Sequence, residues 1–258
     1  MNEHEMLKDR FGNRVFQGKN KEMRVAIELA YADMSRRQTG HSPAMKDACI
    51  AWLLKNVFAG KPQIANFDNW HETQCKKLIE IWNEKKAGFG TVGKAQKVLN
   101  MAFKYISCIT PDYNQVLPYC HMTLDSYTLA WYKDVVRPWA KLKKREDVSA
   151  LVEWSKINSY KDYILIQDNI REFLKQGATY SISINKTNTQ SIPLSSVPME
   201  AEFVVWEGQI IKEKYTNLIK EMKNYTQKHR GSPAGKEYDA WLLGEMFADF
   251  VRDYCQSF

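Results

Sequence analysis

No stretch of this 258-residue sequence approaches the roughly 18 to 20 consecutive apolar residues that a membrane-spanning helix needs. The first nine residues, Met1 to Asp9, carry several charged side chains and lack the apolar centre of a secretory signal. We therefore expect a soluble protein of the cell interior, located in the cytoplasm and without a membrane partner.

Cysteine and histidine are scarce and scattered. The five cysteines are an odd number and include no Cys-x-x-Cys pair, which argues against a disulfide framework, a zinc ribbon and an iron–sulfur cluster. The five histidines contain no His-Glu-x-x-His or similar ligand spacing. The sequence therefore predicts neither a metal centre nor any other cofactor. The cysteines are Cys49, Cys75, Cys108, Cys120 and Cys255.

The chain also lacks an internal repeat and any proline- or glycine-rich linker long enough to separate domains. Hydrophobic residues make up 44% of the composition and aromatic residues 12%, which is typical of a chain that buries a sizeable core. A single domain over residues 1–258 is the expected organisation.

Apolar residues recur at helical spacing along most of the chain, which predicts a mainly α fold. Ser42 and Pro43 are typical of an N-cap and first helical position, and open a helix over residues 43–58. Asp68 or Asn69 is placed to cap the next helix, which ends near Lys86. A further helix follows Asp125. The remaining expected helices cover residues 22–37, 94–107, 146–156, 159–175, 199–224 and 236–255.

Residues 176–197 interrupt the helical pattern. They are rich in serine, threonine and asparagine, and only Tyr180 to Ile184 alternates polar and apolar side chains. This segment predicts a small β-hairpin or loop insertion in the helical bundle.

Basic residues exceed acidic ones by 37 to 30, giving a formal charge of +7. Six of the cations fall within thirteen residues. Such a cluster is compatible with the solvated end of a helix or with a patch that contacts phosphates, and both interpretations stay open. The six are Lys133, Arg137, Lys141, Lys143, Lys144 and Arg145.

A glycine-rich hairpin precedes one of the expected helices, in the stretch GFGTVGKAQKVLN from Gly88 to Asn100. Hairpin glycines allow positive φ and leave backbone amides bare, so a phosphate can approach the start of the following helix. Lys94 and Lys97 lie three residues apart on that helix and share roughly one face, where each can lower the pKa of the other.

Asp125 follows this helix and stands at the expected start of the next one, where it is a suitable N-cap. A lysine amine and a nearby carboxylate are the minimum groups for amine attack on a sugar carbon. The amine acts as nucleophile, and the carboxylate stabilises positive charge and assists proton transfer.

The two segments GTVGKAQKVLN, from Gly90, and MTLD, ending at Asp125, resemble the helix-hairpin-helix (Gly/Pro/Asp) superfamily of DNA glycosylases. Within it the likeness is greatest to the 8-oxoguanine DNA glycosylase fold, including its archaeal branch. The resemblance spans residues 68–135 and implies a helix-hairpin-helix core there, with residues 136–258 as a helical C-terminal half of unassigned role.

The resemblance implies roles for particular residues. Lys97 becomes the Schiff-base nucleophile, Asp125 the essential carboxylate, and Gly90 and Gly93 part of a phosphate-binding hairpin. The lysine register differs from the common form of the motif, so Lys94 stays the alternative nucleophile. The implied activity is excision of a damaged or modified base, such as 8-oxoguanine, with or without AP-lyase activity.

The same hypothesis makes double-stranded DNA the expected partner. The residues expected to contact it are Gly90, Gly93, Lys94, Lys141, Lys143, Lys144 and Arg145. An extruded base needs a pocket with apolar or aromatic walls, for which Met101 and Trp206 are the candidates.

Two other functions stay open at the level of sequence. One is a DNA-binding protein without catalysis, which uses the hairpin and the basic cluster to hold phosphates. The other is a helical protein–protein interaction factor, for example in defence against phages.

Overall fold

The computed structural model describes residues 3–60, 66–183 and 189–228 of the chain. Within these ranges the protein is mainly helical, as predicted, and the two strands form one antiparallel hairpin. The α-helices are α1 (Glu3–Val15), α2 (Met23–Ser35), α3 (Pro43–Asn56), α4 (Phe67–Lys85), α5 (Val92–Ser107), α6 (Ser126–Trp131), α7 (Arg137–Leu142), α8 (Tyr160–Leu174) and α9 (Pro198–Lys228). A π-helical turn, Tyr132–Val136, joins α6 to α7.

Helix α3 shows how local sequence sets an element. The side chain of Ser42 accepts a hydrogen bond from the amide of Met45, and Pro43 occupies the first turn, where its missing N–H costs nothing. The expected hairpin is also confirmed. Strands β1 (Thr179–Ser183) and β2 (Thr189–Pro193) pair antiparallel, with Thr179 opposite Pro193.

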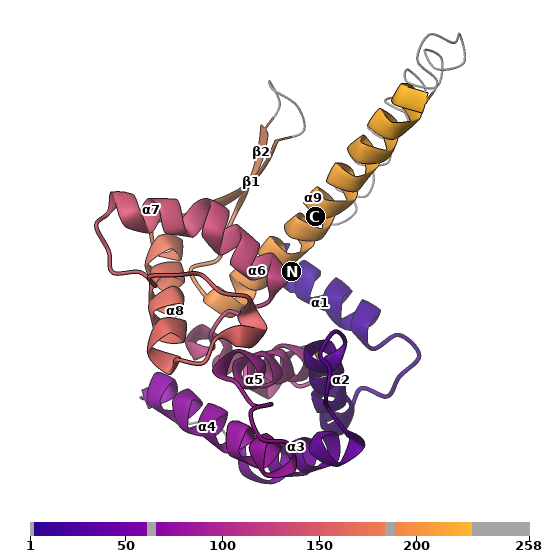
Figure 1. Ribbon diagram of the computed structural model, residues 1–258, viewed down its shortest axis with the longest axis vertical. Helices are drawn as coiled ribbons and strands as arrows, with labels where there is room; N and C mark the ends of the chain where they lie inside the picture. The colour runs from indigo at the N-terminus through magenta and orange to yellow at the C-terminus, as the bar shows by residue number, and fades with distance from the viewer. Residues whose placement is uncertain (1–2, 61–65, 184–188, 229–258) are drawn as a thin grey trace.

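Helix α5 lies near the middle of the helical body, between α2, α4, α6 and α8 (Figure 1). Every residue of α5 from Val92 to Ser107 is buried, including its three lysines, Gln96 and Asn100. A helix with no exposed face needs partners for its polar side chains, since an unpaired buried polar group costs about 1–3 kcal/mol. Those partners define the site described below.

The prediction of a helix over residues 146–156 is wrong. Helix α7 ends at Leu142, Lys144 adopts a left-handed φ of 54°, and only a 3-10 turn, Trp154–Lys156, follows. The segment is held by side chains of other elements instead. Asp147 accepts from Arg137 at 2.6 Å, and Asn169 donates to the carbonyl of Glu146 at 3.0 Å. These tertiary bonds replace the bonds of a local helix.

The start of α4 also differs from expectation. Neither Asp68 nor Asn69 caps the helix, which begins at Phe67 after Asn66. Asp68 lies within the first turn, where its carboxylate binds Arg171 of α8. Helix α1 was not predicted, and the helix expected over residues 236–255 lies outside the described residues.

The β-hairpin and α9 extend away from the helical body, and α1 packs beside the base of α9 (Figure 1). Arg14 of α1 pairs with Glu207 of α9 at 3.0 Å. Across the ranges that the structure describes, no helix is both long enough and apolar enough to cross a membrane.

Candidate functional site

Residues 86–91 join α4 to α5 in a tight turn, in which Gly88 has the positive φ of 74° that favours glycine. The amides of the next two glycines are already occupied. The Gly90 N–H donates to the side chain of Asn83 at 2.8 Å, and the Gly93 N–H donates to the carbonyl of Ile157 at 2.9 Å. The expectation that this hairpin leaves these amides bare for a phosphate is therefore wrong.

Position 93 requires glycine for another reason, which is close packing. A Cβ at this position would lie 1.6 Å from the carbonyl oxygen of Trp154. The absence of a side chain allows the 3-10 turn at Trp154 to pack directly on the first turn of α5. Thr91 caps α5 through its hydroxyl, which accepts from the amide of Lys94 at 3.1 Å and donates to the carbonyl of Ser155 at 2.9 Å.

Gln96 joins α5 to the segment that precedes α6. Its side-chain amide donates to the carbonyl of Leu124 at 2.7 Å, and its oxygen accepts from the amide of Leu124 at 3.1 Å. Both backbone groups of Leu124 are thus satisfied by one side chain. The next residues along the two elements are Lys97 and Asp125, and the Asp125 carboxylate is near enough to act on the pKa of Lys97.

Lys97 is 8% exposed and lies under an aromatic ring. Its Nζ is 4.4 Å from the centre of the Trp154 ring, and in the described chain no hydrogen bond or ion pair engages it. Burial lowers the pKa of the amine, with Asp125 acting in the opposite direction as the next largest influence. A lysine held this way releases its proton more easily than an exposed one.

Lys94 does not share this environment. Its Nζ donates to the carbonyl of Phe89 at 2.8 Å and lies 4.0 Å from the centre of the Phe89 ring. Burial lowers the pKa of Lys94, and Lys86 adds to the effect. The two ammonium groups lie against different rings, and the expected effect of Lys97 on the pKa of Lys94 is not seen.

Asp125 caps α6, as predicted. One carboxylate oxygen, Oδ1, accepts from the amides of Tyr127 and Thr128 at 2.9 and 3.0 Å. The Asp125 amide donates to the Thr128 hydroxyl at 2.8 Å, which completes a capping box. Within the described chain no hydrogen bond reaches the second oxygen, Oδ2. The cap therefore fixes the carboxylate while leaving one oxygen for another partner.

A buried ion pair supports the same segment from the other side. Lys104 of α5 and Glu202 of α9 are 2.9 Å apart and about 1% exposed. Glu202 also accepts from the amide of Thr123 at 2.6 Å. The Lys104 ammonium lies among the rings of Phe11 and Phe203, at 4.5 and 4.6 Å. The pair thus ties α9 to the residues immediately before Asp125.

A chain of polar side chains runs from Gln96 through the core. The Gln96 oxygen accepts from the amide of Asn100, whose other N–H donates to the hydroxyl of Tyr163 at 3.0 Å. That hydroxyl then donates to His121 Nδ1 at 2.8 Å, and Nε2 of His121 donates to Asp68 at 2.7 Å. Because Leu124 fixes the orientation of the Gln96 amide, every proton in the chain has a defined place.

The orientation of the Asn100 side-chain amide, set by its bond to Gln96, fixes the tautomer of His71. The Asn100 oxygen can only accept, so Nε2 of His71, 3.0 Å away, carries the proton. Burial lowers the pKa of both imidazoles, to about 4 for His121 and well below the usual value for His71. Both rings are therefore neutral at pH 7.

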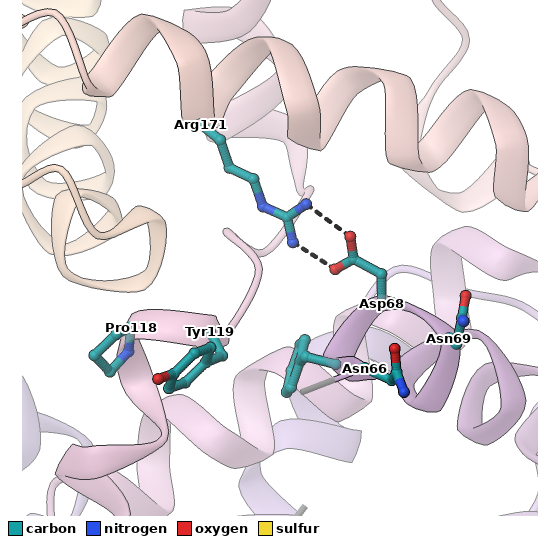
Figure 2. A pocket seen from close by; sticks show the side chains of 7 residues that line it. Asn66, Asp68, Asn69, Pro118, Tyr119 and Arg171 are labelled. Atoms are coloured by element: carbon teal, nitrogen blue, oxygen red, sulfur yellow. Dashed lines mark hydrogen bonds and ion pairs between the residues drawn. The ribbon is translucent and has the colours of Figure 1, made fainter. Parts of the chain in front are cut away.

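This series of hydrogen-bonded side chains ends at Asp68, which lines a pocket of about 380 Å³. Figure 2 shows Arg171 reaching from α8 to Asp68 at the start of α4, with Tyr119 and Pro118 on the opposite wall. Burial alone would raise the pKa of Asp68, but hydrogen bonds from His121 and Arg171 hold it well below its usual range. Neither Lys97 nor Asp125 lines this pocket. Its lining residues are Asn66, Phe67, Asp68, Asn69, Pro118, Tyr119 and Arg171.

The basic cluster after α6 divides into two kinds of residue. Arg145 donates to Asn169 at 2.9 Å and Arg137 to Asp147, so both arginines hold the fold together. Lys141, Lys143 and Lys144 are exposed, around a Leu142 that is 83% exposed. Lys133, in the π-helical turn, is exposed as well. These four lysines match the expectation of solvent-facing cations, whereas the two arginines do not.

The two residues expected to line a base pocket are packed against the protein. Met101 is 6% exposed. Trp206 is half-buried and lies edge-on to Phe11 and Tyr127, at 5.9 Å from each, with Arg14 over its ring. Tyr127, two residues after Asp125, is the ring that Trp206 contacts, and neither residue lines the pocket described above.

The sequence did not predict that Gln96, Glu202, Trp154 and His121 belong to this arrangement. Single polar residues within apolar helical stretches were the available signal for Gln96 and Glu202. Nothing in the local sequence indicates which partners such residues find, because the partners lie on distant elements.

In the described part of the chain, no cluster of three histidine, cysteine, aspartate or glutamate side chains has the arrangement that could hold a metal ion. Comparisons with protein-family models, with curated proteins and with solved structures gave no match. The arrangement of side chains is therefore the basis for the function proposed next.

Proposed function

We propose that this protein is a DNA glycosylase that removes a damaged or modified base by amine attack from Lys97, assisted by Asp125. One observation supports the proposal: Gln96 joins α5 to the segment before Asp125, and the buried Lys97 amine has a lowered pKa that Asp125 opposes. Among the described residues, one oxygen of the Asp125 carboxylate accepts no hydrogen bond. The resemblance of the two sequence segments to the helix-hairpin-helix glycosylases points to the same pair of residues.

The chemistry begins with the neutral Lys97 amine. Its lone pair forms a bond to C1′ of the nucleotide while the glycosidic bond breaks, and the base leaves with the bonding electrons and takes up a proton. The new C–N nitrogen loses a proton. Opening of the C1′–O4′ bond then gives a protonated Schiff base and a hydroxyl at C4′, once the oxygen has taken a proton. Asp125 stabilises the positive charge that develops at C1′.

Burial favours this role for Lys97 over Lys94. The amine of Lys94 is held by the carbonyl of Phe89, which favours its charged form. The amine of Lys97 has an aromatic ring as its neighbour and no acceptor within the described residues. To reach a sugar carbon, Lys97 has to leave the Trp154 ring, so the proposal requires the 154–156 turn to move when DNA binds.

Reductive trapping tests the proposal directly. Sodium borohydride reduces a Schiff base to a stable amine, so a duplex with one 8-oxoguanine should become covalently attached to the wild-type protein. A panel of duplexes with other oxidised or alkylated bases extends the test. Absence of a covalent product across the whole panel would overturn the proposal. Lys97→Ala should abolish trapping, whereas Lys94→Ala should retain it.

Asp125→Asn separates the chemical role of the carboxylate from its role as a cap. Asparagine is about as good an N-cap as aspartate, so the free energy of unfolding should change by less than about 0.5 kcal/mol. The neutral amide cannot stabilise positive charge, so we expect trapping to fall at least 100-fold. Trapping that survives this change would contradict the assignment of Asp125.

A DNA-binding protein without catalysis is the second candidate, favoured by the exposed Lys141, Lys143 and Lys144. Such a protein would bind undamaged and damaged duplexes alike, with affinity that falls steeply as salt increases. Under this function, Lys97→Ala and Asp125→Asn would leave DNA affinity unchanged, and no duplex would be trapped by borohydride.

A further inference from the structure

The turn between α2 and α3 presents two exposed arginines next to the candidate site. Arg36 and Arg37 follow the last residue of α2, and both are exposed. Arg36 pairs with Asp33 at 2.6 Å. In the part of the chain that the structure describes, no acid lies within ion-pair distance of Arg37. A cation without a partner is available to an external anion.

This turn is attached to α5 on the face that carries Lys97. The hydroxyl of Tyr105, two turns further along α5, donates to Asp33, the partner of Arg36. Helix α2 also packs along α5. Through Asp33, the two arginines are therefore joined to the same helix that carries Lys97.

At its other end the same turn contacts the α4–α5 hairpin. A Cβ on Gly40 would lie 1.9 Å from the ammonium nitrogen of Lys86, so the lysine extends across this glycine. Lys86 is exposed and, like Arg37, has no ion pair among the residues described. Lys86 is also close enough to Lys94 to lower the pKa of that amine, which burial has already lowered.

Three exposed cations thus gather at the α2–α3 turn, and we call them the cationic strip: Arg36, Arg37 and Lys86. It extends from the α4–α5 hairpin, at Lys86, along the α2–α3 turn. The exposed lysines of the 141–144 turn lie elsewhere. They are separated from Asp125 by the helical run from Ser126 to Leu142, which is roughly 25 Å long (Figure 1).

We propose that the cationic strip holds the phosphodiester backbone of the DNA whose nucleotide is presented to Lys97 and Asp125. The inference rests on the function proposed above and assigns the substrate-binding surface of that site. Arginine and lysine at adjacent exposed positions bind phosphates through charge and through hydrogen bonds, and sequence is not read. The side chains of Arg37 and Lys86 carry this role, since neither forms an ion pair with any residue that the structure describes.

The salt dependence of DNA affinity tests the assignment. Each lost phosphate contact makes the slope of log K against log salt concentration less negative by about 1. Arg37→Ala/Lys86→Ala should therefore change the slope by about 2, measured with a short duplex carrying one 8-oxoguanine and with its undamaged counterpart. The control is Lys141→Ala/Lys143→Ala, which removes two exposed cations at a distance and should leave the slope unchanged.

Borohydride trapping, measured on the same proteins, distinguishes the two proposals. Trapping by the wild type together with a reduced slope only in Arg37→Ala/Lys86→Ala supports both. Trapping with a reduced slope only in Lys141→Ala/Lys143→Ala overturns the cationic strip and retains the glycosylase. A slope that depends on Arg37 and Lys86 without any trapping supports the strip and overturns the enzyme. Absence of DNA binding at low salt overturns both.

Discussion

Gln96 and Leu124 form a reciprocal pair in which one side chain substitutes for a backbone partner. The side-chain amide donates to the Leu124 carbonyl at 2.7 Å, and the side-chain oxygen accepts from the Leu124 N–H at 3.1 Å. Both residues are buried, so water cannot replace these bonds. Gln96 is therefore a main link between α5, which carries Lys97, and the segment that ends at Asp125.

Gln96→Ala should therefore destabilise the protein strongly. It leaves two buried backbone groups unpaired, each at about 1–3 kcal/mol, so we expect a loss of about 3 kcal/mol or more in the free energy of unfolding. Urea denaturation measures the loss. Gln115→Ala is the matched control, because Gln115 is exposed and binds only the nearby carbonyl of Asp112. A loss of less than 1 kcal/mol in Gln96→Ala would contradict this account.

Local signals in the sequence were enough to place several elements. Ser42 with Pro43 located the start of α3, and Asp125 located the start of α6, because capping depends on residues three positions apart. The alternation at Tyr180 located β1. The prediction of a helix over residues 146–156 was wrong because this segment is held by distant residues. Its backbone groups bind Asn169 and other distant side chains, and sequence spacing does not reveal such partners.

The sequence predicted two residues of the candidate site but not the contacts that position them. Lys97 and Asp125 were named from their motifs, and the geometry that relates them comes from Gln96, Glu202 and Gly93. Gly93 is an instructive case. The sequence favoured a phosphate-binding glycine, whereas the structure gives the residue a packing role against Trp154. Whether a position requires glycine depends on which atoms pack against it, and these atoms come from distant parts of the chain.

Gly93→Ala tests the packing role. Alanine is better than glycine in a helix by about 1 kcal/mol, but its Cβ would meet the backbone oxygen of Trp154. A backbone atom cannot move aside as a flexible side chain can. The clash should therefore outweigh the helix preference, giving a net loss of at least about 2 kcal/mol in a urea titration.

Gly60→Ala is the control for that substitution, since nothing lies within 4 Å of a Cβ at residue 60. Its free energy of unfolding should match that of the wild type within about 0.5 kcal/mol. Tryptophan fluorescence adds a second reading for Gly93→Ala, because displacement of the 154–156 turn should expose Trp154 to solvent. Equal stability of the two variants would show that the close approach at Gly93 is unimportant.

Lys104→Met should cost about 3–5 kcal/mol at pH 7, because it leaves Glu202 charged and buried without its partner. Burial already raises the pKa of Glu202, and loss of Lys104 raises it further. An acid whose pKa is higher in the folded state stabilises the fold below its unfolded pKa, near 4.3, and the stability is lost as pH rises. The destabilisation should therefore be larger at pH 8 than at pH 5.

The double variant Lys104→Met/Glu202→Gln is the control for that charge. Glutamine keeps an oxygen for the Thr123 amide and cannot ionise. Urea midpoints measured between pH 5 and pH 8 should show no additional pH dependence in the double variant, and a higher stability at pH 8 than Lys104→Met alone. If the single variant showed the same loss at both pH values, lost packing rather than a buried charge would be its cause.

His121 should make the protein sensitive to mild acid. Burial lowers its pKa to about 4 in the folded state, against 6.5 for an unperturbed imidazole. Between these values the unfolded chain binds the additional proton, so stability falls as pH decreases from 6.5 to 4. The difference between the two pKa values corresponds to roughly 3 kcal/mol. Urea titrations at pH 7, 5.5 and 4.5 measure this decline.

His121→Gln removes the titrating ring and keeps a donor and an acceptor for Asp68 and Tyr163. The variant should be less stable than the wild type at pH 7, because glutamine fills the space less well. Its stability should nevertheless decline less between pH 7 and pH 4.5. Part of the decline will persist, since His71 is buried and neutral as well and must also take up a proton on unfolding.

His41→Gln is the matched control. His41 is exposed in the α2–α3 turn, so its replacement removes an imidazole that faces solvent. Its stability should decline with pH as steeply as that of the wild type. If His121→Gln also declined as steeply as the wild type, the acid sensitivity would not come from this ring. The carboxylate of Asp68, whose stabilising contribution is lost only as pH falls below about 4, would remain outside the measured window.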